Sequence, residues 1–239
     1  MDFETQEISI ENFYNYLKLN SLDTFEKIKE HFEGEEYKLK IKEDNDFNDL
    51  FNIINNHDSN KNKSIVRFCN GVIMDKNTLK IKSYTFNKCY EEDKMINNDF
   101  LRGELYVEQC YEGTLIKIFY HNNMWITSTK KMIDSRKSKW ISNKNFYELF
   151  LDTLNGYNIY EKLDPNNCYS FLLCHNDNNI VVKYDKNYLI HLNTVDLINN
   201  NEIEYTIVHE CPNIIKSMRE IVNLDETNRA ENIIKMINN

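Results

Sequence analysis

The sequence predicts an α+β protein whose strands form antiparallel sheets. Short segments with alternating apolar residues, joined by turns rich in Asn and Asp, fill the middle of the 239-residue chain, whereas helical spacing dominates its first third. The regular alternation of strand and helix that marks a parallel sheet does not occur. We therefore expect a mainly helical segment over residues 1–60, packed on one sheet-based domain over residues 61–239.

Helices are expected first. Residues 9–21 begin with a candidate N-cap, Ser9, followed by apolar side chains at helical spacing, and residues 21–34 repeat this spacing and stop at a glycine. Residues 37–42 alternate strictly and predict a strand. Residues 46–57 predict a short helix with four apolar side chains on one face: Phe47, Leu50, Phe51 and Ile54.

From residue 64 the pattern changes to strands. Residues 64–75 and 78–86 predict a hairpin around the turn Asp75-Lys76-Asn77, and residues 114–129 predict another around His121-Asn122-Asn123. The remaining expected elements are a strand over 103–109, a helix over 143–156, three strands within 168–196, and helices over 213–223 and 229–239.

The composition argues against several classes of protein. No apolar run approaches the roughly 20 residues that a membrane-spanning helix needs, and the acidic start of the chain lacks the basic region of a secretory signal. We therefore expect a cytoplasmic protein with no membrane partner. The six cysteines contain no Cys-x-x-Cys pair and the six histidines show no ligand spacing, so we expect free thiols and no metal site. A net charge of −9 argues against an electrostatic binder of bulk nucleic acid, and no DNA partner is expected.

One stretch runs against this acidic balance. The segment STKKMIDSRKSKW, residues 128–140, holds five basic residues against one acid, Asp134. A solvated loop is one interpretation. The other is a surface that contacts RNA phosphates, with the tryptophan at its end stacked on a base. The candidate RNA-binding residues are Lys130, Lys131, Arg136, Lys137, Lys139 and Trp140.

Four segments, in this order, are similar to the motifs of one family. RFCNGVIMDKNTLKIKSYTFNKCYEED resembles an Arg-Gly-led strand with its hairpin, and YVEQCYEGTLIKIFYHNNMWITSTKKMI resembles a Lys-x-Asp-Gly-Ser nucleophile motif with its hairpin. CYSFLLCHNDNNIVVKYDKNYLIHLNTVD resembles a strand with a central acid and the hairpin after it. CPNIIKSMREIVN and RAENIIKM resemble a later helix and a Glu-Gly-x-Val strand. Together the segments resemble the phage-type ATP-dependent RNA ligases (the first RNA ligase family), which are covalent nucleotidyltransferases.

The resemblance implies an antiparallel-sheet nucleotidyltransferase core, ATP-grasp-like, as in RNA and DNA ligases. In that family a lysine attacks the α-phosphate of ATP and carries AMP; here its position is Cys110. The family's acidic residue falls on Leu172, its arginines fall on Asn70 and Asn179, and the final two-lysine motif is absent. The positions that the resemblance still assigns to nucleotide binding are Lys88, Glu112, Gly113, Lys117, Lys183 and Glu231.

The combined loss of the nucleophile and the phosphate-binding groups favours a pseudoenzyme. We expect a degenerate, non-catalytic domain that binds RNA or nucleotide, or that serves as a scaffold for a protein partner, with no cofactor and no metal. Two alternatives stay open: an active ATP-dependent RNA ligase, which would need ATP and Mg²⁺, and a purely structural interaction subunit. Because this ligase family is known from viruses, the resemblance also implies a viral source.

Overall fold

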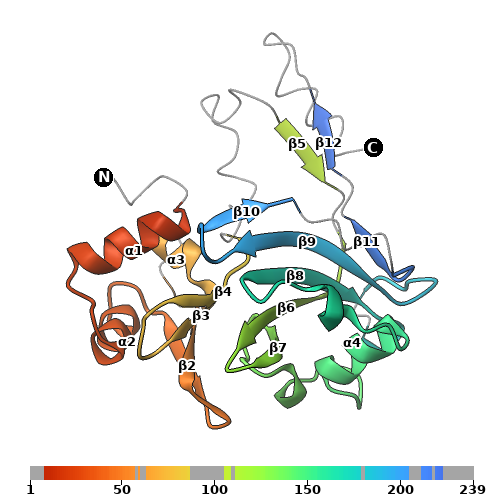
Figure 1. The fold of residues 1–239 in the computed structure, drawn as a ribbon, viewed down its shortest axis with the longest axis horizontal. Coiled ribbons are helices and arrows are strands. Elements are labelled where there is room, and N and C mark those ends of the chain that lie inside the picture. Colours follow the sequence, from red (N-terminus) through yellow and green to blue (C-terminus); the bar gives the residue numbers. More distant parts are fainter. Residues whose placement is uncertain are drawn as a thin grey trace. The chain divides into compact units, whose positions relative to one another are not determined.

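The chain divides into two compact units (Figure 1). The computed structural model describes residues 8–56, 59, 63–86, 105–108, 111–178, 181–204, 211–216 and 219–222. The larger unit comprises residues 1–88 and 112–216, and the smaller unit comprises residues 89–111 and 217–239. In the smaller unit, β5 (Leu105–Glu108) pairs antiparallel with β12 (Arg219–Val222).

The first sheet of the larger unit has four antiparallel strands in the order β1-β2-β3-β4. Their bounds are β1 Lys40–Asp44, β2 Phe47–Ile54, β3 Asn70–Asp75 and β4 Ile81–Ser83. The helices of this part are α1 Ile10–Leu19, α2 Phe25–Glu33 and α3 Ser64–Phe68. The two longer helices begin at side-chain caps, because the hydroxyls of Ser9 and Thr24 each accept a hydrogen bond from the backbone N–H three residues on.

The second sheet of the larger unit has six strands. Five follow the order β10-β9-β8-β6-β7, and β11 pairs parallel with β9. Their bounds are β6 Thr114–His121, β7 Met124–Thr129, β8 Asn167–Cys174, β9 Tyr188–Asp196, β10 Asn201–Ile203 and β11 Ile214–Lys216. The helical elements between them are η3 Ser135–Lys137, α4 Phe146–Leu154, η4 Ile159–Lys162 and η5 Asn176–Asn178. A reciprocal capping box between Asn145 and Glu148 starts α4.

The larger unit has four layers, which are the N-terminal helices, the four-stranded sheet, the six-stranded sheet and α4. An apolar cluster fills each of the three spaces between these layers. The first cluster joins α1 and α2 to one face of the four-stranded sheet, with Phe13, Phe32 and Phe51 among its members. The second joins the other face of that sheet to the six-stranded sheet and includes Ile73 and Phe119. The third joins the far face of the six-stranded sheet to α4. Figure 1 shows α1 and α2 beside the four-stranded sheet and α4 beside β6 and β8.

These elements confirm the α+β class, with helices at the N-terminal side and two antiparallel or mixed sheets. Both predicted hairpins form. Asp75 Oδ1 accepts hydrogen bonds from the backbone of the β3–β4 turn, and Asn122 and Asn123 take positive φ angles (47° and 61°) between β6 and β7. The strand predicted over 103–109 and the helix predicted over 143–156 are also found. No helix among the described residues has the length and apolar character needed to cross a membrane.

Other local predictions are wrong. In place of the helix predicted over 46–57, strand β2 covers residues 47–54, and its side chains from Leu50 to Ile54 are all buried. The strand lies between two packed layers, so it lacks the alternation that identifies a strand with one solvent face. The segment 1–60 therefore holds strands as well as helices, and β2 pairs with β3, which lies beyond residue 60.

Three further segments differ from prediction. The helix predicted over 213–223 is replaced by β11 and β12, and the strand predicted over 64–75 begins as α3. Of the three strands predicted within 168–196, β8 and β9 form, while the described residues 181–187 between them contain no strand. The helix predicted over 229–239 lies outside the described residues.

Candidate functional site

The two sheets of the larger unit face each other along β3 and β6, where alternate side chains of each strand point into the layer between them. Three facing pairs follow along the strands: Lys117 with Gly71, Phe119 with Ile73, and His121 with Asp75. The middle pair is apolar and buried, and the pairs on either side of it are polar. We call the two polar regions the lysine end (Lys117 and Gly71) and the histidine end (His121, Asp75 and the neighbouring Asp49).

At the lysine end, the Lys117 side chain is fully buried and its Nζ donates a hydrogen bond to the carbonyl oxygen of Gly71. Burial, with a smaller contribution from Lys130, lowers the pKa of Lys117 to about 8. No carboxylate of the described residues takes part in this shift. An amine with such a pKa is suited to act as a base or nucleophile, but a fully buried amine meets no substrate.

Lys117 belongs to a polar row that crosses the six-stranded sheet. Its register partners are Ser128 on β7 and Ser170 on β8, and Ser170 is paired in turn with Asn193 on β9. All four side chains are buried. Within the described residues, Ser170 Oγ and Asn193 Oδ1 have no hydrogen-bond partner. These unsatisfied polar groups lower the stability of the folded chain, and burial of the surrounding apolar clusters must compensate for that loss.

The turn before β6 is closed by its own neighbours. A Cβ atom on Gly113 would lie 2.7 Å from Leu173 O and 2.8 Å from Leu172 Cγ, so only glycine fits there. The Glu112 carboxylate accepts hydrogen bonds from two backbone N–H groups, at 2.9 and 2.5 Å, in the loop that follows β8. Glu112 thus anchors this loop against the turn.

The space beside this turn is too small for a nucleotide. The cavity bordered by residues 112–114, the end of β8 and Tyr184 measures about 10 Å³, which is room for a single water molecule. Small-molecule sites commonly enclose about 300–1,000 Å³. Leu172, at the position where the resemblance predicts an acidic residue, is one of the groups that cover Gly113.

The residues expected to bind nucleotide do not converge on one pocket among the described residues. Glu112 and Gly113 share the turn, but Lys117 lies on β6 three residues past Thr114, which is about 10 Å along the strand. Lys183 is exposed in the loop after β8. The positions that lie outside the described residues are Lys88, Cys110, Asn179 and Glu231.

The basic stretch 128–140 runs beside β1, an edge strand of the four-stranded sheet. Two of its basic side chains are neutralised locally: Lys137 pairs with Asp44 and Asp46, and Arg136 pairs with Asp134. The others differ in exposure. Lys130 is partly buried, whereas the exposed members are Lys131, Lys139 and Trp140, the last with 69% of its surface accessible.

Strand β1 adds two lysines to this surface. Lys42 Nζ lies 3.6 Å from Met132 Sδ, and burial together with the charges of Lys40 and Lys131 lowers the pKa of Lys42. We call Lys40, Lys42 and Lys131 the lysine cluster. The strict alternation of YKLKIK already places both β1 lysines on one face of a strand. Nothing in the sequence predicts that residue 131 lies beside them.

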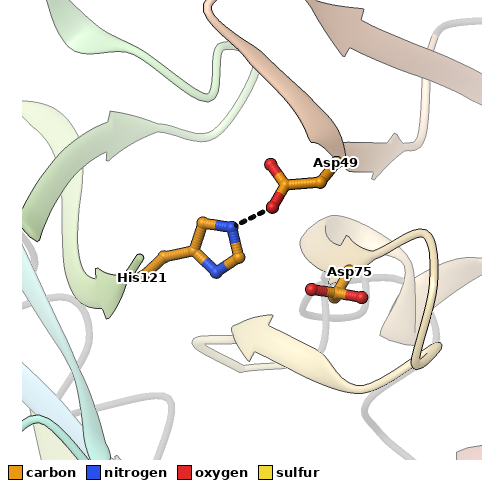
Figure 2. A group of neighbouring side chains, drawn as sticks. All are labelled: Asp49, Asp75 and His121. Atoms are coloured by element: carbon orange, nitrogen blue, oxygen red, sulfur yellow. Dashed lines mark hydrogen bonds and ion pairs between the residues drawn. The ribbon is translucent and has the colours of Figure 1, made fainter. Parts of the chain in front are cut away.

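Two groups of Asp and His side chains in the described part of the chain are close enough to hold a metal ion. One is the histidine end, shown in Figure 2, and the other comprises Asp152, His175 and Asp177 around α4. The sequence predicts neither group, because their members come from separate strands and loops and show no ligand spacing.

An open groove of about 770 Å³ lies elsewhere on the larger unit, lined by α1 and by the turns that follow β3 and β9. Ile198 in its lining is 66% exposed. Leu79, also in the lining, has a positive φ of 54°, which is uncommon for a leucine. The groove offers an apolar surface with lysines at its rim, and its backbone is locally strained.

These observations define an α+β protein of two facing sheets, with a buried lysine at one end of the layer between them and an Asp-His group at the other. No protein-family model matches the chain. The chain is similar to a protein named immediate-early protein ICP-46 homolog, from Invertebrate iridescent virus 3, with 26% identity over 133 residues. The match covers 49% of this chain and 30% of the viral protein, so it spans less than a third of that relative.

Proposed function

We propose that this chain is a non-catalytic RNA-binding module, built on a nucleotidyltransferase-like core that has lost the ligase chemistry. The observation that carries the proposal is the lysine cluster. Its three like charges crowd one edge of the four-stranded sheet, and burial and the two neighbouring lysines lower the pKa of Lys42. Lysines crowded in this way gain stabilisation when phosphate groups approach them.

Three features of the described residues support binding over catalysis. The turn that would present the nucleophile is covered by Leu172 and Leu173. The cavity beside that turn has a volume of about 10 Å³. Lys117, the first lysine after the turn, is buried and hydrogen-bonded to Gly71. The active-ligase alternative requires each of these features to rearrange.

The proposed kinship with RNA ligases has support from the strands. Three of the four segments that carry the resemblance form the hairpins β3–β4 and β6–β7 and the adjacent strands β8 and β9. The fourth, which resembles a helix of the family over residues 213–223, forms β11 and β12 instead. The similarity to an iridovirus protein supports the viral source that the resemblance implies. A cytoplasmic location belongs to the same proposal.

The proposed RNA path runs across β1 and the exposed part of the 128–140 stretch. The lysine cluster contacts phosphates, and Trp140 stacks on an unpaired base. This combination recognises single strands with little sequence preference. With three lysines engaged, the logarithm of the association constant falls against the logarithm of salt concentration with a slope of about −2.

The test is fluorescence anisotropy with a labelled single-stranded RNA of about 12 nucleotides, between about 50 and 200 mM salt. The double variant Lys42→Ala/Lys131→Ala should bind about tenfold more weakly at the lower salt, because two phosphate contacts are lost, and its salt slope should flatten by about 1.4. Trp140→Ala should weaken binding by about tenfold through lost stacking and leave the salt slope unchanged.

The matched control is Lys27→Ala/Lys144→Ala. It removes the same charge from lysines that pair with Asp23 and Asp152. Its affinity should stay within about twofold of the wild type. If both double variants lost the same RNA affinity, the binding would depend on net charge alone. That result would overturn the proposed role of the lysine cluster. A wild-type chain that binds no RNA would overturn the proposal and favour the interaction-subunit alternative, for which the groove beside α1 is the surface to test.

A further inference from the structure

Three strands bring one ligand-type side chain each to the histidine end: Asp49 from β2, Asp75 from the end of β3 and His121 from the end of β6. One ligand atom of each residue lies within 4.8 Å of those of the other two. Figure 2 shows the three side chains converging from separate strands, with Asp49 and His121 in direct contact and the Asp75 carboxylate beside them.

Asp75 is fixed in place by the turn that follows it. Its Oδ1 accepts hydrogen bonds from Asn77 N (2.9 Å), Thr78 N (2.8 Å) and Thr78 Oγ1 (3.0 Å). Its Oδ2 receives no hydrogen bond from a described residue, although only 7% of Asp75 is exposed. This oxygen keeps a small contact with solvent, so a water molecule can satisfy it until a cation takes the place of that water. Asp75 therefore offers a ligand atom that the protein itself leaves unsatisfied.

His121 and Asp49 form a hydrogen-bonded pair next to this oxygen. His121 Nε2 lies 2.7 Å from Asp49 Oδ2, which also accepts a hydrogen bond from Asn122 Nδ2 at 2.9 Å. Asp49 Oδ2 is thus in contact with two side chains of the β6–β7 hairpin. The Asp49 side chain is 31% exposed, which opens the group to solvent.

Among the described residues, the negative charge of the histidine end has no basic partner other than His121. In the part of the chain that the structure describes, no lysine or arginine forms an ion pair with Asp49 or Asp75. The nearby Lys76 pairs instead with Glu43, at 2.5 Å. Two carboxylates and one imidazole therefore meet without a lysine or arginine of the described residues to balance their charge.

The group around α4 differs in this respect. Lys144 forms ion pairs with both of its carboxylates, those of Asp152 and Asp177. Both ring nitrogens of His175 are also engaged, because Nδ1 accepts a hydrogen bond from Asp177 N at 3.0 Å and Nε2 lies 2.9 Å from Asn187 Nδ2. This balanced group needs no further cation, and it provides a matched control.

We propose that Asp49, Asp75 and His121 bind one divalent transition-metal ion of the Zn²⁺ or Mn²⁺ class. Two carboxylates with one imidazole suit such ions. When Nε2 of His121 binds the ion, the proton that lies between Nε2 and Asp49 passes to Nδ1 of the same imidazole. Because metal–ligand distances are about 2.0–2.2 Å, the 2.7 Å contact opens to about 3 Å. The ion would join β6 of one sheet to β2 and β3 of the other. Three protein ligands leave at least one coordination position for water or another oxygen ligand.

The test is metal binding by the chelator-treated full chain. Titration with MnCl₂, followed by the paramagnetic resonance of free Mn²⁺, and calorimetry with ZnCl₂ should each report one site. Mg²⁺ and Ca²⁺ should bind at least about tenfold more weakly, because they prefer oxygen ligands alone. The Mn²⁺ titration is essential, because the chain has six cysteines and thiolates bind Zn²⁺.

Three variants locate the site. Asp49→Asn and Asp75→Asn should each weaken Mn²⁺ and Zn²⁺ binding at least about tenfold, because each loses one charged ligand. Asp152→Asn, in the balanced group, should leave both affinities within about twofold. Asp49→Asn is the decisive variant: the side chain is partly exposed and asparagine has the same size, so the fold is retained, which circular dichroism checks.

The Zn²⁺ absorption edge gives an independent readout of the ligands. Nitrogen and oxygen neighbours with an imidazole signature are expected. Selective loss of binding in Asp49→Asn, with Asp152→Asn unaffected, supports the proposal. Wild-type chain that binds no Mn²⁺, binding that survives both Asp49→Asn and Asp75→Asn, or sulfur neighbours around Zn²⁺ would overturn it.

Discussion

The lysine end and the histidine end lie on the same pair of strands, yet they treat charge in opposite ways. At the lysine end a single cation, Lys117, is buried and donates to the carbonyl oxygen of Gly71. Four residues further along β6, about 13 Å away, two carboxylates meet the imidazole of His121. Because the backbone framework is shared, the side chains alone create the difference.

The two ends differ in how far solvent reaches their charged groups, and this difference decides which of them can bind a ligand from solution. Lys117 has no exposed surface, so burial lowers its pKa to about 8 and also keeps substrates away from its amine. Asp49 keeps 31% of its side chain exposed, so a cation from solution has a route to the histidine end. One end is therefore a closed structural contact, and the other is an open candidate site.

The largest expected effect comes from crowding the lysine end. Gly71 has a φ of +91°, and a Cβ atom there would lie 2.6 Å from Lys130 O. Gly71→Ala should lower the free energy of unfolding by about 3 kcal/mol or more, because the backbone angle and the clash are both unfavourable. Urea denaturation measures this change.

Gly156→Ala is the control for that variant. Gly156 also has a positive φ, +83°, but a Cβ atom added there would meet nothing within 4 Å. It should therefore lose only about 1 kcal/mol. An equal loss in the free energy of unfolding at the two glycines would show that the backbone around Gly71 can shift to accept a Cβ atom. The lysine end would then not be tightly packed, which would contradict the comparison between a closed and an open end.

A smaller effect is expected from removing the buried charge. Lys117→Met keeps a similar volume and should raise the free energy of unfolding near pH 7 by about 1–3 kcal/mol. Folding lowers the pKa of Lys117 from 10.5 to about 8. The unfolded chain therefore binds more protons between these values, and the wild type gains stability as the pH rises through them.

The advantage of Lys117→Met should accordingly shrink between about pH 7 and about pH 10, measured by urea denaturation of both proteins. The comparison between the two proteins removes the contribution of other groups that titrate in this range. A difference that stays constant with pH would contradict burial of the charged amine as its cause.

The smallest effect is expected at the histidine end without metal. Asp49→Asn weakens the hydrogen bonds from His121 and Asn122 and should lower the free energy of unfolding by about 1 kcal/mol at neutral pH. The pKa of Asp49 is lowered in the folded chain. Its contribution is therefore present above the ordinary carboxyl pKa and is lost as the pH falls through the folded value. Chemical denaturation of both proteins should show the difference vanish in acid; a difference that persists there would assign it to packing.

The sequence predicts most of the fold where local signals act alone. The Asn122-Asn123 hairpin follows from turn chemistry, and the helix predicted over 143–156 forms as Phe146–Leu154. The prediction fails where a strand is buried on both faces, because its sequence then lacks the alternation of apolar and polar residues that identifies a strand. Strand β2 is buried from Leu50 to Ile54, so its apolar run has no strand period and resembles a helix.

The candidate site was predictable only in part. The basic stretch and the β1 lysines can be read from the sequence, but their meeting at Lys131 depends on how a loop lies along an edge strand. The histidine end joins residues 49, 75 and 121, and no local spacing relates them. Lys117 can be identified as a strand residue, whereas its burial against Gly71 requires the second sheet.

The central claim is that the turn before β6 and the lysine end, which form part of the proposed ligase-like core, carry out no nucleotide transfer. Incubating the full chain with α-labelled ATP and Mg²⁺ or Mn²⁺, then denaturing it, measures the covalent intermediate directly. We expect no label on the denatured chain. Covalent label on the wild type that disappears in Lys117→Met, or in Cys110→Ala, would contradict the claim.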